Sequence, residues 1–163
     1  MIEYKSVSGG RRLEGHSVQG ILPIDVEDNG DLRLYKLELP FLPPSKNVYD
    51  GWPGTWKHAA KGKWVRYISE WADRLAIPRA SHVGLAAVLV FPTKGRRDPQ
   101  NYAQALWHWV PDALVRAGVL DDDREGHIDI GPNWGLRFAY DLRKGVPKER
   151  RQRTHIALTM RLK

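Results

Sequence analysis

The chain has 163 residues, 42% of them hydrophobic and 28% charged, which is typical of one globular domain and excludes a disordered chain. It contains no cysteine, so disulfides and thiolate metal sites are excluded. Its formal net charge is +7, from 26 Lys and Arg against 19 Asp and Glu, which favours a polyanion such as nucleic acid as a partner.

No segment is suited to a membrane. The longest apolar run, residues 83–92, is too short to cross a bilayer. The first ten residues also lack the apolar core of a secretory signal. We therefore expect a cytoplasmic location and no membrane partner.

Two regions are expected along the chain. Residues 1–32 hold five glycines and no sustained period, so we expect a partly irregular N-terminal extension. Residues 33–163 form the main domain. Its expected elements are, in chain order, a strand over Arg33–Leu39, a helix over Thr55–Leu75, a strand over Val83–Phe91, a helix from Asp98 to near Gly118, and a final strand pair over Ile128–Tyr140 and His155–Leu162 joined by a basic loop. This order predicts a single compact α+β domain with a mixed sheet, and the apolar run over Val83–Phe91 predicts a central strand buried on both faces.

The second helix begins with a good capping signal. An aspartate at the N-cap, Asp98, accepts bonds from free backbone amides, and Pro99 fits the next position. Asp98 therefore has a structural interpretation as well as a functional one. Helical spacing puts a polar stripe opposite the apolar face, either solvated or turned towards a ligand. The stripe consists of Asn101, Gln104, His108 and Asp112.

Three successive aspartates follow the second helix, at Asp121, Asp122 and Asp123. They repel one another, and clustered carboxylates suit a hard cation such as Mg²⁺. The alternative is an exposed acidic turn with no ligand.

The basic excess lies at the C-terminus, because residues 143–163 hold eight Lys and Arg against one Glu, or +7. This segment is either a surface for a polyanion or a solvated tail. Cations that attract a phosphate backbone, combined with carboxylates that hold a metal, provide the ingredients for metal-dependent phosphodiester cleavage.

Three motifs in this order resemble the RusA-like Holliday junction resolvases of bacteria and their phages. The family pattern Arg-Arg-Asp-x-Asp-Asn is matched by residues 96–101, Gly-x-x-x-Asp-Asp by residues 118–123, and Pro-Pro-Ser-x-Asn by residues 43–47. The resemblance covers about residues 33–163. It implies a homodimer that resolves four-way DNA junctions by paired symmetric nicks, in recombination and repair, with Mg²⁺ as cofactor, Mn²⁺ as a substitute and no small organic cofactor.

The resemblance also implies roles for individual residues. Asp98 matches the first metal-binding and catalytic aspartate, and Asp122 and Asp123 match the acidic pair, with Asp123 the catalytic member. Asn101 and Asp112 match supporting positions of the motif and the helix. The expected DNA contacts are Lys46, Lys94, Arg96, Arg97, Arg150, Arg151 and Arg153.

Two departures from the family pattern bear on activity. Gln100 replaces the second aspartate, so one ligand charge is lost, although the amide oxygen can still bind or support a metal. Trp107 stands where the family has a lysine, and an indole cannot stabilise developing negative charge. The alternatives are an active enzyme with altered ligands and a branched-DNA-binding protein with weak or absent cleavage. A basic RNA-binding or interaction protein, with the acidic turn as mere surface, is a third reading.

Helix length constrains how such a site is built. A helix over residues 99–117 is roughly 28 Å long, and residues 118–123 reach back by at most roughly 20 Å. We therefore expect each site to join Asp98 of one subunit to Asp122 and Asp123 of the other.

Seven tryptophans are an unusually large number for this length. Trp56, Trp64 and Trp71 follow helical spacing and are expected in the core or a dimer contact, whereas Trp107, Trp109 and Trp134 are expected to pack around the second helix. Stacking on unpaired bases is the alternative role for these rings.

Overall fold

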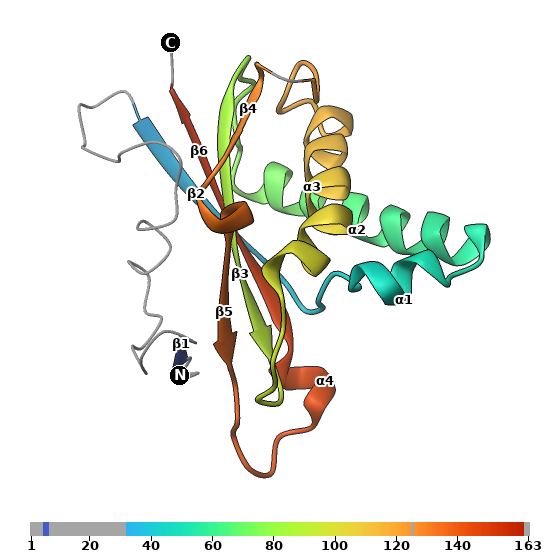
Figure 1. Ribbon diagram of the computed structural model, residues 1–163. Coiled ribbons are helices and arrows are strands. Elements are labelled where there is room, and N and C mark those ends of the chain that lie inside the picture. The colour runs from blue at the N-terminus through green and yellow to red at the C-terminus, as the bar shows by residue number, and fades with distance from the viewer. Residues whose placement is uncertain (1–4, 7–31, 125, 162–163) are drawn as a thin grey trace.

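The computed structural model describes residues 5–6, 32–124 and 126–161. A mixed sheet carries helices on one side, so the predicted α+β class is confirmed (Figure 1). Most of the predicted extension lies outside the described residues. Its β1 (Lys5–Ser6) pairs antiparallel with β5 (Leu136–Tyr140).

The strand order is β1–β5–β3–β6–β2, and β4 pairs with β3 as well. The strands not yet placed are β2 (Leu32–Leu39), β3 (Val83–Phe91), β4 (Ile128–Ile130) and β6 (Arg153–Arg161). β3 is parallel to β4 and β5 along one edge and antiparallel to β6 along the other. All nine residues of β3 are buried, as its apolar run predicts, and neighbouring strands pair with both of its edges.

The helices are α1 (Lys46–Asp50), α2 (Gly54–Arg74), α3 (Pro99–Arg116) and α4 (Lys148–Arg151). α2 and α3 occur within one or two residues of their predicted limits, because their apolar faces pack in the core and the start of α3 carries the capping signal of Asp98. The short α1 and α4 lie where loops were expected. None of the helices in the described ranges has the length and apolarity that a membrane span requires.

The predicted final strand pair is wrong in two respects. The first expected strand is divided into β4 and β5 by a 3-10 turn, η2 (Asn133–Gly135), which follows Pro132. β5 and β6 also do not pair with each other, because β3 lies between them. Alternation identifies strands, but it does not specify their partners, and the buried β3 takes the central position.

The main core lies between the sheet and helices α2 and α3. Leu106, Val110, Ala113 and Leu114 of α3 are buried there, as the predicted apolar face requires, together with Trp109. Trp64 of α2 is buried against Trp109, with ring centroids 5.7 Å apart. The polar face of α3 is thereby directed away from the sheet.

Candidate functional site

Asp98 caps the first turn of α3, as predicted. Its side chain accepts a hydrogen bond from the backbone N–H of Gln100 at 3.1 Å, and Pro99 occupies the first helical position. The Asn101 N–H donates to the Asp98 carbonyl at 3.1 Å, so Asn101 belongs to the same turn. The Asp98 carboxylate is nevertheless exposed, which leaves oxygen lone pairs for another ligand.

The loop between β3 and α3, residues 92–98, is held by one of its own arginines. The guanidinium of Arg97 lies 4.0 Å from the Phe91 ring centroid and donates to the carbonyl and hydroxyl of Thr93, at 2.9 and 3.2 Å. Arg97, a predicted DNA contact, therefore shapes the loop. Lys94 and Arg96 of the same loop are exposed.

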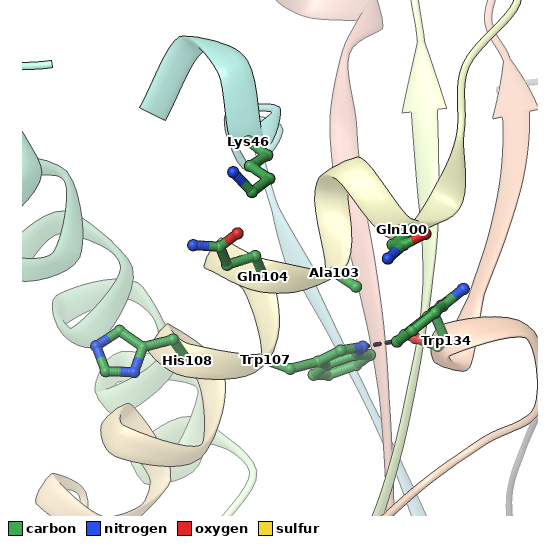
Figure 2. Close-up of a pocket in the computed structure, with 7 residues that line it drawn as sticks. All are labelled: Lys46, Gln100, Ala103, Gln104, Trp107, His108 and Trp134. Carbon is green, nitrogen blue, oxygen red and sulfur yellow. Dashed lines mark hydrogen bonds between the residues drawn. The ribbon is translucent and has the colours of Figure 1, made fainter. Parts of the chain in front are cut away.

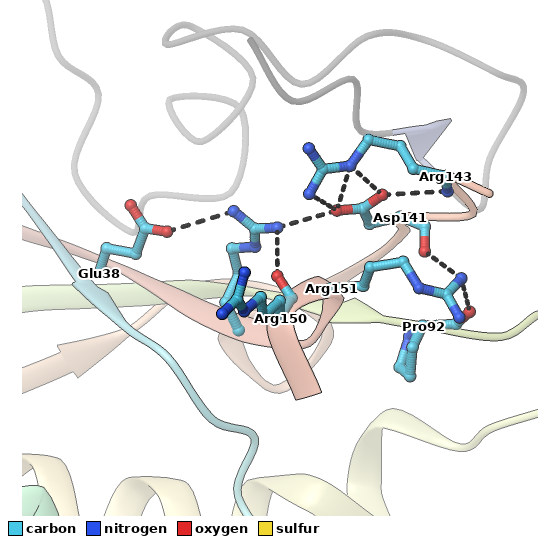
Figure 3. Close-up of polar contacts among 7 residues, drawn as sticks. Glu38, Pro92, Asp141, Arg143, Arg150 and Arg151 are labelled. Atoms are coloured by element: carbon cyan, nitrogen blue, oxygen red, sulfur yellow. Dashed lines mark hydrogen bonds and ion pairs between the residues drawn. The ribbon is translucent and has the colours of Figure 1, made fainter. Parts of the chain in front are cut away.

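A buried carboxylate organises two arginines at this end of the sheet. The side chain of Asp141 is 0% exposed and pairs with Arg143 and Arg153, each at 2.9 Å (Figure 3). Arg153 is itself buried, at 6% side-chain exposure, and also reaches Glu38 at 3.5 Å. A buried charge requires such partners, so the guanidinium of Arg153 is committed to the interior.

Arg151 joins α4 to the loop before α3. Its Nη1 donates to the carbonyls of Pro92 at 2.8 Å and Asp141 at 3.1 Å (Figure 3). Exposed cations from the loop and from α4 are thereby brought to one end of the sheet. We call them the basic end: Lys94, Arg96, Lys148 and Arg150.

The aspartates after α3 form a surface turn, here called the acidic turn (Asp121–Asp123), in which Asp121 and Asp123 are exposed and Asp122 is half-buried. Asp121 pairs with Arg79, and Asp122 pairs with Arg124. The hydrogen bond from Arg124 lowers the pKa of Asp122, because it favours the ionised carboxylate. Asp123 is exposed and forms no ion pair with a described residue.

Asp98 and the acidic turn lie at opposite ends of α3. The helix has 18 residues and is therefore about 27 Å long at 1.5 Å per residue. Leu120 forms a bridge with Ala80, so the chain beyond α3 continues towards the start of β3 and does not turn back to Asp98. Within the described ranges no three His, Asp or Glu side chains are grouped to hold a metal. The described residues of one chain consequently do not fit Mg²⁺, which prefers several oxygen ligands.

Asp112 is removed from both groups. It forms ion pairs at 3.1 Å with Lys61 of α2 and with Arg116 one turn later. These contacts give Asp112 a role in fastening α2 to α3. These ion pairs are sufficient to explain an aspartate at this position without a role in a metal site.

The remaining polar stripe of α3 borders an open pocket with a volume of about 450 Å³ (Figure 2). The lining residues are Lys46, Gln100, Ala103, Gln104, Trp107, His108 and Trp134. Lys46, a predicted DNA contact, is exposed at one side and pairs with Asp50 at 2.7 Å. The stripe therefore lines a cavity along part of its length, which helical spacing alone left undecided.

Trp107 links α3 to the turn η2. Its indole N–H donates to the backbone carbonyl of Trp134 at 2.6 Å. Asn133 and Trp134 have φ values of 55° and 60°, a left-handed conformation that costs about 1–3 kcal/mol at each non-glycine residue. This pocket wall was not predicted, although Pro132, Asn133 and Gly135 lie within four residues and are turn signals that mark the break in the strand.

No protein-family model matches this chain, and no curated protein matches it either.

Proposed function

We propose that the chain is a metal-dependent endonuclease that resolves four-way DNA junctions and acts as a homodimer. The observation that carries the proposal is the position of two acidic groups at the surface, Asp98 and the acidic turn, at opposite ends of one helix. Two copies related by a two-fold axis can bring Asp98 of one chain to Asp122 and Asp123 of the other, and the same operator produces a second site. A pair of equivalent sites suits a junction with approximate two-fold symmetry.

The basic end supports DNA as the substrate. Lys94 and Arg96 are exposed on the loop that leads to Asp98, and Arg150 is exposed on α4, which Arg151 fastens to that loop. Exposed cations beside a carboxylate attract the phosphate backbone to the place where a metal would act.

Mg²⁺ would be held by Asp98 of one chain and by Asp122 and Asp123 of the other. A bound divalent ion supplies a polarised phosphoryl oxygen and an activated water. Arg124 pairs with Asp122 at the surface, and exposed ion pairs are weak, so a cation can replace this partner. The exposed arginines and lysines of the basic end orient the DNA strand.

A nicking assay on a synthetic four-way junction tests the proposal. We expect the wild-type chain to produce paired nicks in Mg²⁺ or Mn²⁺. Asp98→Asn and Asp123→Asn should each abolish nicking, and Asp123→Asn should preserve or tighten junction binding because it removes a negative charge near the phosphates. Asp121→Asn is the matched control and should cut normally, because Asp121 lies outside the proposed ligand set.

Mixing the two inactive variants tests the two-chain site. In a mixed dimer one site carries both substitutions and the other carries none. An equal mixture should therefore recover about a quarter of the wild-type nicking sites, since half of the dimers are mixed and half of their sites are intact. Failure of the mixture to recover any nicking would refute the shared site, and normal cutting by both single variants would refute the residue assignment.

A second candidate function is branched-DNA binding without efficient cleavage. The observation that favours it is the contact of Trp107, at the position of the family's lysine, with the carbonyl of Trp134. An indole engaged in this way supplies no positive charge to a reaction. Under this alternative the chain binds junctions in EDTA and leaves them intact with either metal. Preference for RNA over junction DNA would instead favour an RNA-binding protein.

A further inference from the structure

The pocket beside α3 has an unusual wall. Asn133 and Trp134 are consecutive non-glycine residues with positive φ, and the Trp134 side chain remains 52% exposed. A large apolar ring that is held outward by a strained backbone gains little from the core. Such strain persists where the surrounding structure enforces it, and it concentrates at binding sites.

The surroundings of Trp134 do enforce this conformation. Its carbonyl accepts the Trp107 indole N–H at 2.6 Å, and the Asn133 amide donates to the Leu136 carbonyl at 3.2 Å. Gly135 follows with φ of 66°, and a Cβ there would lie 2.7 Å from Cγ2 of Ile130. The close packing behind the turn keeps Trp134 at the border of the pocket.

The chemistry of the lining matches a nucleobase. Trp107 and Trp134 supply indole rings, and base–aromatic stacking needs only a π-face. Gln100 and Gln104 supply side-chain amides, each with donors and an acceptor that complement base edges. No carboxylate is among the described lining residues, and the nearby carboxylate of Asp50 is paired with Lys46 at 2.7 Å. A volume of about 450 Å³ lies within the range of ligand pockets, which is about 300–1,000 Å³.

We propose that this pocket binds an unpaired base of a DNA strand, with Trp134 as the stacking surface and Gln100 and Gln104 at the base edge (Figure 2). The inference rests on the DNA-binding part of the proposed function. Because the backbone N–H of Gln100 donates to the Asp98 carboxylate at 3.1 Å, the pocket adjoins the proposed cleavage site. A base that is unpaired at a branch would be held there while its strand passes the carboxylate.

Fluorescence anisotropy in EDTA tests the pocket without cleavage. The two probes are DNA duplexes of equal length, one fully paired and one with an unpaired three-base bulge. We expect the wild-type chain to prefer the bulged duplex, and Trp134→Gly to reduce that preference roughly five- to a hundredfold, the range that corresponds to loss of one stacked base. Glycine adopts positive φ readily, so this substitution removes the ring and relieves the backbone, and the fold is retained.

Two matched variants complete the design. Trp56→Ala removes another exposed tryptophan, 60% exposed on α2 and outside the pocket, and should leave the preference unchanged. Trp134→Phe keeps an aromatic face and should retain most of the preference for the bulged duplex. A 2-aminopurine in the bulge gives an independent readout, because stacking quenches its fluorescence and Trp134→Gly should relieve the quenching.

The outcomes separate the inference from the proposed function. A preference that survives Trp134→Gly, or that Trp56→Ala reduces equally, overturns the pocket assignment. A wild-type chain that binds both duplexes equally but nicks four-way junctions overturns the pocket alone. A chain that binds neither duplex nor a four-way junction overturns the DNA-binding function and the pocket with it.

Discussion

The two ends of α3 both combine arginines with aspartates, but in different ways. At the basic end a buried carboxylate, Asp141, holds Arg153 in the interior, and Arg151 fastens the adjacent loop. At the other end Asp121 and Asp122 form surface pairs with Arg79 and Arg124. Buried pairs are costly to break, whereas exposed pairs exchange partners readily.

This difference indicates which charges are available for function. The buried network commits Arg151 and Arg153 to structure and leaves Lys94, Arg96 and Arg150 directed to the surface. The acidic turn can release its arginines to a stronger ligand. The comparison therefore predicts stability effects at one set of residues and binding effects at another.

The largest expected effect on stability comes from the buried network. Asp141→Asn removes the charge that compensates Arg153 and should lower the free energy of unfolding by about 3 to 5 kcal/mol. Asp123→Asn at the acidic turn should change it by less than about 0.5 kcal/mol, because Asp123 is exposed. Urea unfolding followed by circular dichroism measures both. Equal effects would contradict the distinction between the two ends.

The next effect concerns binding and leaves stability nearly unchanged. Substituting Lys94, Arg96 and Arg150 together with alanine should weaken DNA binding. The slope of log K against log salt should become shallower by about 2.7, or about 0.9 for each lost phosphate contact. Anisotropy titrations of a labelled four-way junction at several salt concentrations measure this slope.

The control variant loses the same number of positive charges, but at a different place on the surface. Alanine at Lys63, Arg66 and Arg74 also removes three exposed positive charges, but from α2. This variant should keep most of the wild-type slope. If the slope of log K against log salt becomes shallower by the same amount in both triple variants, then net charge governs binding and the basic end does not.

The smallest expected effect is on folding stability, concerns His82 near the acidic turn, and depends on pH. Both ring nitrogens of His82 face oxygen atoms, the Gly126 carbonyl at 3.0 Å and the Asp129 carboxylate at 2.7 Å. Both oxygens are acceptors, so both hydrogen bonds form only when the imidazole is protonated on both nitrogens. The hydrogen bond to the Gly126 carbonyl, with that to Asp129, raises the pKa of His82. The resulting stabilisation is complete below the ordinary value of 6.5 and is lost as pH rises through the raised pKa.

The magnitude should be about 0.5 kcal/mol or less, because the His82 side chain is 41% exposed and solvent screens the pair. The urea midpoint of the wild-type chain minus that of His82→Gln should fall slightly between pH 5.5 and 8. This difference isolates His82 from His155, whose pKa is lowered by burial and whose contribution to stability has the opposite pH dependence. His58→Gln, at an exposed position on α2, is the control, and its midpoint minus that of His82→Gln should fall in the same way. A difference between the wild-type and His82→Gln midpoints that stays constant or rises with pH would contradict the assignment.

Local patterns were sufficient for much of the fold. The Asp98–Pro99 cap, the apolar face of α3 and the apolar run of β3 all occur as predicted, since capping, helical period and strand burial depend on neighbouring residues. The final strand pair failed because β5 and β6 choose β3 as their partner over a long sequence distance. The residues of the candidate site lie where their motifs predict, at the two ends of α3, and the two-chain site stays a prediction.

Sequence alone determined the class of the fold, the limits of its two long helices and the separation of Asp98 from the acidic turn, because helix rise is a constant of the backbone. Only the tertiary structure decided which cations are available. Arg96 and Arg153 are indistinguishable as letters, yet one is exposed and the other is buried against Asp141. The tertiary structure likewise decided that Trp134 borders a pocket. The turn that holds this ring depends on packing against Ile130 and on a hydrogen bond from Trp107, which is distant in sequence. Burial and charge pairing are properties of the assembled chain, and neighbouring residues do not encode them.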